Sequence, residues 1–169
     1  LIQYGVEEAY TPGYYSSVQA QEEEFEIPVK QWQNVSGLED GKVYILKNAS
    51  GQALSTASDG HDVGFSWVSA DAAKTSNRAR WVASEKDGKV RLTNLEGQTL
   101  SFWYGNGNPT DFFAIKEQGE DNNRKQYFSD NAFGDGMVLS YSGHYVSQEQ
   151  LSNGKYNRTT DSSKALVLT

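Results

Sequence analysis

The chain contains no cysteine, three prolines, one methionine and two histidines among its 169 residues. The lack of cysteine excludes disulfides, thiolate zinc sites and a cysteine nucleophile. No apolar stretch approaches the roughly 20 residues that cross a bilayer, so we expect no membrane insertion. Lys and Arg number 15 against 22 Asp and Glu, a formal net charge of −7. Such an acidic balance argues against nucleic acid as a partner.

Motifs that carry catalysis or hold metals are also missing. There is no Gly-x-Ser-x-Gly elbow and no His-Glu-x-x-His helix, and neither His61 nor His144 has a set of catalytic partners in its own loop. The segments Asp59-Gly-His61-Asp62 and Glu117 to Asn123 could be metal loops by composition, but a plain turn and a solvated loop are favoured. We therefore predict that the protein is not an enzyme and needs no cofactor and no metal.

Short apolar runs bounded by Gly, Asn, Asp and Ser recur along the chain, and only Ser69 to Ser76 has a helix-like composition, about two turns long. This pattern predicts an all-β protein. Within it, the sequence Gly-x-x-apolar-Ser occurs three times, starting at Gly51, Gly97 and Gly143, which are spaced 46 positions apart. A fixed period of this length indicates repeated structural units.

Each repeat can be extended to four short strands. Before the repeated motif comes a Gly and a strand-like run, in which alternation puts two apolar side chains on one face of the strand, Val43 with Ile45 and Val90 with Leu92. The three first strands are Gly41-Lys-Val43-Tyr-Ile45, Gly88-Lys-Val90-Arg-Leu92 and Gly136-Met-Val138-Leu-Ser140. Third strands are expected at Phe65 to Val68, Phe112 to Ile115 and Tyr156 to Thr159, and fourth strands at Arg80 to Val82, Gln126 to Phe128 and Ala165 to Val167.

Three units of four strands predict a β-trefoil, in which six strands close a barrel and three hairpins cap it. We assign it to residues 31–169, after an extended or β segment at 1–30. Two sets of buried residues should be related by the pseudo-threefold axis. They are Leu54, Leu100 and Val146, and Trp81, Tyr127 and Leu166.

The run Val43-Tyr-Ile-Leu-Lys-Asn48-Ala-Ser-Gly51-Gln-Ala-Leu54 resembles the opening of a ricin-type lectin repeat, and the resemblance extends over roughly Trp32 to Thr169. It implies a module that binds carbohydrate. The chain departs from the family at two places. Only the aromatic residue of the family's Gln-x-Trp is kept, at Trp81 and Tyr127. Where the family has the Asp that holds the sugar, this chain has Ser55, Ser101 and Ser147, which weakens a galactose site of the ricin kind.

The first 30 residues lie outside the repeat. Leu1 to Tyr14, followed by Phe25-Glu-Ile27, resembles the end of a collagen-adhesin B-repeat (Cna-B) domain, which implies a piece of a bacterial surface protein. In that family a Glu assists a Lys-to-Asn isopeptide bond. Glu8 matches the Glu, but Val29 stands where the Asn would be, so we predict no such bond within this chain. The alternative is an extended acidic linker that packs against the trefoil.

The candidate ligand site is the segment from Phe102 to Pro109, where two large rings stand beside amides and glycines. Pyranose rings stack on aromatic faces, and sugar hydroxyls take hydrogen bonds from amides. We predict ligand binding by Trp103, Tyr104, Asn106 and Asn108. The alternative is that Trp103 folds back to cap the barrel.

Together these features predict a non-catalytic carbohydrate-binding module of a large secreted or cell-surface bacterial protein, either an adhesin or a modular glycan-acting protein. We expect a monomeric module of a longer chain, extracellular or at the cell surface, whose partner is a glycan. The alternative partner is a host surface protein, because aromatic loops on a rigid barrel also suit protein recognition, and the missing aspartates favour it.

Overall fold

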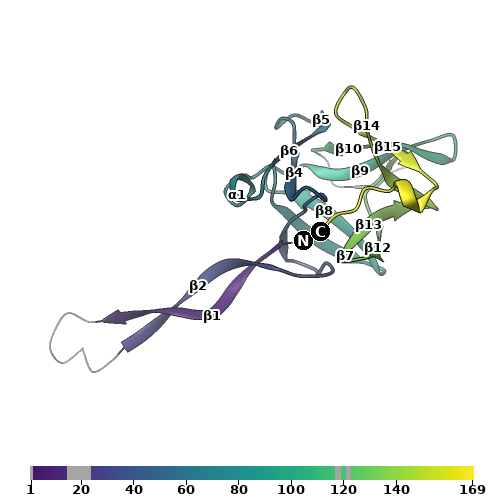
Figure 1. Ribbon diagram of the computed structural model, residues 1–169. Coiled ribbons are helices and arrows are strands. Elements are labelled where there is room, and N and C mark those ends of the chain that lie inside the picture. The colour runs from purple at the N-terminus through teal and green to yellow at the C-terminus, as the bar shows by residue number, and fades with distance from the viewer. Residues whose placement is uncertain (1, 15–23, 117–118, 121–122) are drawn as a thin grey trace.

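A computed structural model of the chain describes residues 2–14, 24–116, 119–120 and 123–169, with side chains from Gln31 onward. The described part consists mostly of antiparallel strands (Figure 1), which confirms the all-β prediction. The elements are β1 (Ile2–Tyr14), β2 (Glu24–Asn34), β3 (Val43–Ile45), β4 (Gln52–Thr56), β5 (Asp62–Val63), β6 (Phe65–Ser69), α1 (Ala70–Ala73), β7 (Trp81–Lys86), β8 (Lys89–Asn94), β9 (Thr99–Gly105), β10 (Asn108–Ile115), β11 (Arg124–Lys125), β12 (Ser129–Phe133), β13 (Gly136–Tyr141), β14 (His144–Gln150), β15 (Tyr156–Thr159) and the 3-10 helix η2 (Ser162–Lys164).

The strands form the three predicted units of a β-trefoil. The first strands of the units are β3, β8 and β13, and the second and third strands pair as the hairpins β4–β6, β9–β10 and β14–β15. In each unit the returning chain pairs with the first strand, through Tyr44 with Trp81, Val90 with Phe128 and Met137 with Leu168. These pairs close the barrel, and the β-trefoil prediction is confirmed.

The last residue of the chain connects the third unit to the first. Lys47 donates its N–H to the carbonyl of Thr169 at 2.9 Å, and Thr169 donates its own to the carbonyl of Lys47 at 2.8 Å. Links between the other units are the ordinary hairpins β7–β8 and β12–β13. All three joints of the barrel are therefore made by backbone hydrogen bonds.

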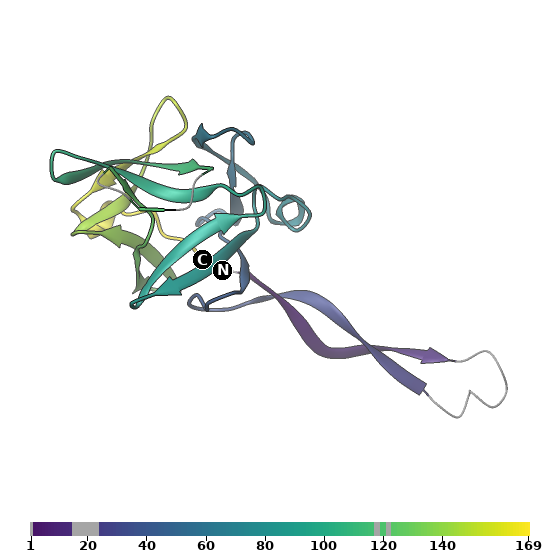
Figure 2. The ribbon, with the colours of Figure 1, turned by 180° about the vertical axis from the view of Figure 1, so that it is seen from behind.

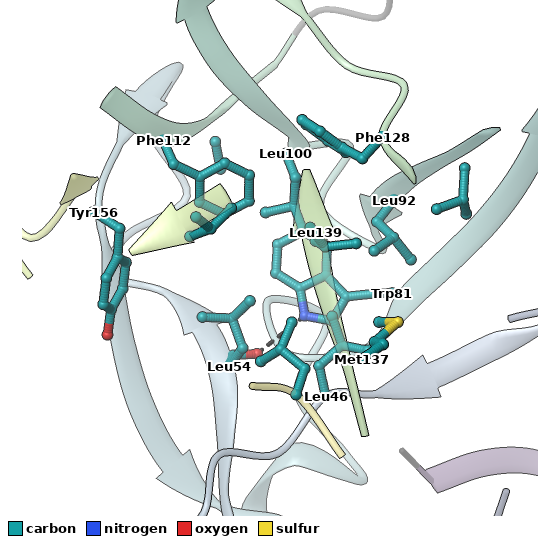
Figure 3. Close-up of a cluster of buried hydrophobic side chains, with 14 of the residues drawn as sticks. Leu46, Leu54, Trp81, Leu92, Leu100, Phe112, Phe128, Met137, Leu139 and Tyr156 are labelled. Carbon is teal, nitrogen blue, oxygen red and sulfur yellow. Dashed lines mark hydrogen bonds between the residues drawn. The ribbon is translucent and has the colours of Figure 1, made fainter. Parts of the chain in front are cut away.

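The core is built from threefold sets of apolar side chains (Figure 3). Leu54, Leu100 and Val146 are 1%, 0% and 2% exposed, so their predicted burial is confirmed. Their spacing of 46 residues follows the sequence repeat. Two further sets, not predicted, are Leu46, Leu92 and Leu139, and Phe65, Phe112 and Tyr156.

The second predicted set is right in one unit and wrong in two. Trp81 is fully buried, but Phe128 and Leu168 occupy the corresponding core positions, while Tyr127 and Leu166 are only half-buried. The bridges of Val90 to Phe128 and of Met137 to Leu168 determine this register. In the second unit the shift is one residue, and since side chains alternate across a strand it turns Tyr127 to the other face. In the third unit the core residue, Leu168, lies two positions after the predicted one.

Strand β3 has apolar residues on both of its faces. Tyr44 and Leu46 point into the central core, whereas Val43 is half-buried and Ile45 belongs to a separate apolar cluster beside α1. Both faces of this strand are covered, so its apolar residues do not alternate with polar ones and periodicity cannot choose a face. The helix itself is one turn long, shorter than predicted, with Ser69 as N-cap accepting the N–H of Ala72 at 3.1 Å.

Strands β1 and β2 form a long antiparallel ribbon that extends away from the trefoil (Figures 1 and 2). Its base pairs with β3 through Ile2 to Ile45 and Tyr4 to Val43, and β2 continues without a break past residue 30. The side chains of Glu8 and Val29 lie outside the described residues, as do residues 22 and 23 of the run Glu22-Glu-Glu24 that makes the linker acidic. The Cna-B and linker interpretations of residues 1–30 therefore stay predictions.

Candidate functional site

The candidate site lies at the end of the β9–β10 hairpin rather than in an irregular loop. Asn106 and Gly107 connect the strands with φ angles of 51° and 81°. Two successive positive φ values are those of a type I′ turn, for which Asn-Gly is the preferred sequence. Trp103 and Tyr104 consequently lie within strand β9, where the pleat determines their directions.

The pairing of the two strands divides the predicted residues between two faces. Gly105 pairs with Asn108, and Tyr104 pairs with Pro109. By alternation Trp103 and Asn108 therefore share the outer face of the hairpin, while Tyr104 lies on the inner face with the buried Pro109. Trp103 is 43% exposed, which argues against the alternative that it caps the barrel.

The outer face carries a third group that the sequence analysis missed. Arg124 of the short strand β11 pairs in register with Trp103, which places its side chain on the same face. The indole also lies along the backbone of Gly105, where an added Cβ would be 3.6 Å from Trp103 Nε1. This face thus presents an aromatic ring between a guanidinium group and an amide, with Asn106 exposed at the turn.

Tyr104 has different neighbours on the inner face. Its ring packs edge-to-face against Tyr141, with 5.7 Å between centroids and an interplanar angle of 87°. The ammonium group of Lys125 lies 5.5 Å from the Tyr104 centroid and 5.9 Å from that of Tyr141. The structure therefore brings Trp103, Asn106 and Asn108 together and separates Tyr104 from them.

The three serines that replace the family's aspartates are structural. All three are at most 5% exposed. The hydroxyls of Ser55 and Ser101 donate to the carbonyls of Thr56 and Phe102 at 3.0 and 3.2 Å, and Ser147 Oγ accepts the N–H of Glu149 at 3.1 Å. Their hydroxyls are directed to the backbone and are not placed to hold a sugar.

The corrected register shows a family feature that the sequence analysis overlooked. Because Phe128 and not Tyr127 corresponds to Trp81, Gln126 stands two residues before the buried ring, as in Gln-x-Trp. Gln126 is fully buried and its Oε1 accepts the N–H of Gly119 at 2.8 Å. Its side chain therefore holds the preceding loop.

The candidate metal loops show no metal geometry in the part of the chain that is described. No group of three or more His, Asp or Glu side chains there could hold an ion. Asp62 forms an ion pair with Lys155 at 2.7 Å, and His144 Nδ1 is 2.9 Å from the carbonyl of Ser142. Glu117 and Asp121 lie outside the described residues. None of the helices described is long and apolar enough to cross a membrane.

A hollow of about 410 Å³ lies away from the hairpin, between residues 36–37 and the β12–β13 hairpin. It is lined by Ser36, Gly37, Asp130, Ala132, Gly134, Asp135, Gly136 and Met137. Partial burial, reinforced by the neighbouring Glu85 carboxylate, raises the pKa of Asp130. None of the four predicted site residues lines this hollow.

Comparisons with known proteins identify the fold. No family model matches the chain, and no curated protein matches its sequence. A mosquitocidal holotoxin matches in structure with a TM-score of 0.59 and 16% identity over 85% of this chain, and a Polyporus squamosus lectin with a TM-score of 0.51 and 16% identity over 79%. The chain spans 19% of the toxin and 49% of the lectin. At this identity the likeness shows the fold alone, which is that of the ricin-B-type lectins.

Proposed function

We propose that the trefoil is a non-catalytic carbohydrate-binding module and that its sugar site is the outer face of the β9–β10 hairpin. The observation that carries this proposal is the exposed ring of Trp103, flanked by Asn108 and paired in register with Arg124. A pyranose can stack its apolar face on the indole, while the amide and the guanidinium group bind its hydroxyls or a carboxylate. Asn106 at the turn is the fourth member of the site.

The rigidity of the hairpin supports this assignment. The type I′ turn and the hydrogen bond from Thr110 Oγ1 to the carbonyl of Trp103, at 3.2 Å, hold the strand that carries the ring. Tyr104 does not touch the sugar in this proposal. Its ring packs against Tyr141 on the inner face and so stabilises the position of the hairpin. A preorganised ring loses little conformational entropy on binding.

The structural neighbours support a glycan as the ligand class. The Polyporus lectin was solved with the epitope Neu5Aca2-6Galb1-4GlcNAc, and the other neighbour is a toxin. Buried Ser55, Ser101 and Ser147 argue that the site of this chain differs from the ricin kind. One stacking ring corresponds to an affinity in the high micromolar to millimolar range, about 4–6 kcal/mol.

Weak single sites become useful when they are repeated. We propose that the module belongs to a larger secreted or cell-surface bacterial protein, an adhesin or a modular glycan-acting protein. Repetition of the ligand on a surface would raise the overall avidity.

A glycan array with the whole chain tests the proposal. We expect binding to a limited set of glycans, abolished by Trp103→Ala with no change in melting temperature. The matched control is Phe133→Ala, which removes another aromatic ring that is 42% exposed, on β12, and should leave binding unchanged. Equal loss in both variants, or an array with no bound glycan, would overturn the sugar site. A host protein captured through Trp103 would then support the alternative partner.

A further inference from the structure

A second surface of the trefoil combines lysines with tyrosine rings, and we call it the lysine–tyrosine surface. Lys86 Nζ lies 5.7 Å from the ring centroid of Tyr127, and Lys89 Nζ lies 5.5 Å from that of Tyr141. Lys125 lies over both Tyr141 and Tyr104. The surface is defined by Lys86, Lys89, Lys125, Tyr104, Tyr127 and Tyr141, which come from β7, β8, β9, β11, β13 and the segment before β12.

The strand pairing explains why these groups meet. Lys86 and Lys89 are cross-strand partners beside the type I′ turn Asp87–Gly88, so they point to the same face of the β7–β8 hairpin. Val90 lies on the opposite face of this hairpin, and its side chain is buried in the core. Tyr127 reaches the same side because Phe128 takes the core position, and Arg91 lies 5.0 Å from its centroid.

Acidic residues lie close to this surface: Asp87 is in the turn between Lys86 and Lys89, and Asp40, Glu85 and Asp130 line a small hollow together with Lys89. In the described part of the chain no carboxylate makes an ion pair with Lys86, Lys89 or Lys125. The Glu120 carboxylate at its border instead accepts the N–H groups of Gln126 and Tyr127, at 2.9 and 3.4 Å. Three lysines without a partner in an ion pair among the described residues thus stand together on a chain whose formal net charge is −7.

The tyrosines supply polar groups as well as rings. The hydroxyls of Tyr104, Tyr127 and Tyr141 make no hydrogen bond to any described residue, although each ring is half-buried. Cations occupy positions over the rings, so a ligand meets ammonium groups and hydroxyls rather than bare aromatic faces. This set of donors matches sulfate or carboxylate groups interspersed with sugar hydroxyls.

We propose that the lysine–tyrosine surface binds a sulfated or carboxylated polysaccharide chain, independently of Trp103. A single polysaccharide chain is narrow enough to follow the surface. A lipid bilayer or a DNA duplex presents its negative charge over a wider area and would also meet the acidic remainder of the protein, where repulsion opposes binding. Cations already lie over the three tyrosine rings, which disfavours the base stacking by which single-stranded nucleic acid is bound.

Binding of the whole chain to immobilised heparin, over a series of sodium chloride concentrations, tests the proposal. We expect affinity that falls steeply with salt, since binding releases counterions from the polyanion. The triple variant Lys86→Gln, Lys89→Gln and Lys125→Gln should weaken binding at least about tenfold and flatten the salt dependence. The control variant Lys47→Gln, Lys74→Gln and Lys164→Gln changes the net charge equally and should bind like the wild type.

Three results would overturn the proposal: no binding of the wild type to heparin or chondroitin sulfate, equal loss in both triple variants, or equally tight binding to phosphatidylserine vesicles or duplex DNA. Trp103→Ala is expected to bind heparin normally, so failure of the sugar site and failure of this surface can be told apart. Amide chemical shifts of the wild type on adding heparin fragments provide a measurement that needs no variant. They should move around Lys86, Lys89 and Tyr141, and shifts confined to other regions contradict the proposal.

Discussion

Gly64 lies so close to Gly154 that a Cβ atom on Gly64 would clash with the carbonyl carbon of Gly154. This approach joins the first unit to the third, and Phe65 next to it donates its N–H to the carbonyl of Gly154 at 2.8 Å. The side chain of Gln150 donates to the carbonyls of Phe65 and Gly154, both at 3.0 Å. A side chain at position 64 must therefore displace backbone.

We expect Gly64→Ala to lower the free energy of unfolding by about 1–3 kcal/mol, because the crowded backbone has to move. Urea denaturation measures this change. Gly105→Ala is the matched control: its Cβ would meet Trp103 only at an ordinary contact distance of 3.6 Å, so a change within about 0.5 kcal/mol is expected. An equal loss in the two variants would contradict the role of the contact between Gly64 and Gly154.

The register of the fourth strand in the second unit can be tested by comparing two neighbouring rings. Phe128→Ala should cost about 3–5 kcal/mol, since it removes a fully buried ring from the core. Tyr127→Ala should cost only about 1 kcal/mol, because that ring is half-buried and faces Lys86 and Arg91. Trp81→Ala is expected to resemble Phe128→Ala. A larger loss for Tyr127→Ala than for Phe128→Ala would mean that the predicted register of the sequence analysis was right.

Gln98, in the second unit, binds the loop around Ser58 and Gly60 in the first unit through hydrogen bonds. Its buried amide donates to the carbonyls of Ser58 and Gly60 at 2.9 and 2.8 Å, and its Oε1 accepts from the Thr56 hydroxyl at 2.6 Å. We expect Gln98→Ala to destabilise the protein by about 2–3 kcal/mol, because it leaves these buried groups without partners. Gln52, at the equivalent position 46 residues earlier, is exposed. Gln52→Ala should therefore be nearly neutral when both melting curves are compared.

Asp130 gives a pH dependence of defined sign. Burial and repulsion from Glu85 raise its pKa above the ordinary value of 3.8. At pH values between the ordinary pKa and the raised pKa, the folded state binds more protons than the unfolded state. The contribution of Asp130 to the free energy of unfolding therefore falls as the pH rises from the ordinary pKa through the raised one. Asp130→Asn should thus be more stable than the wild type at neutral pH, and the difference should vanish below about pH 3.8. Urea titrations at both pH values measure it, and a variant less stable at neutral pH contradicts the assignment.

Part of the fold could be predicted because each repeat contains the same kinds of turn residue and apolar residue at the same spacing. The positive φ of Gly51, Gly97 and Gly143 is a requirement of the backbone at equivalent turns, and it recurs with the period of the fold. The strand predicted at Tyr156 to Thr159 has the bounds of β15. Turn residues and the apolar residues spaced from them therefore determine where most strands lie.

The same reasoning cannot choose the residue that faces the core where a strand has apolar residues at neighbouring positions. Tyr44 and Ile45 are both buried, in different clusters, and Tyr127 and Phe128 are both large rings. Which of the two enters the core depends on the partner strand, and in the second unit that partner residue, Val90, is 38 positions away from Phe128. A one-residue change of register exchanges their faces.

For the candidate sites, composition alone shows that two large rings stand beside Asn and Gly residues. The folded chain adds that Trp103 and Tyr104 lie on opposite faces, with Arg124 beside Trp103 and Lys125 beside Tyr104. It also brings Lys86 to Tyr127 and Lys89 to Tyr141. These relationships are not visible in the sequence because a surface is assembled from strands that are distant in the chain. Its members are selected by backbone pairing, and no spacing within the sequence records that pairing.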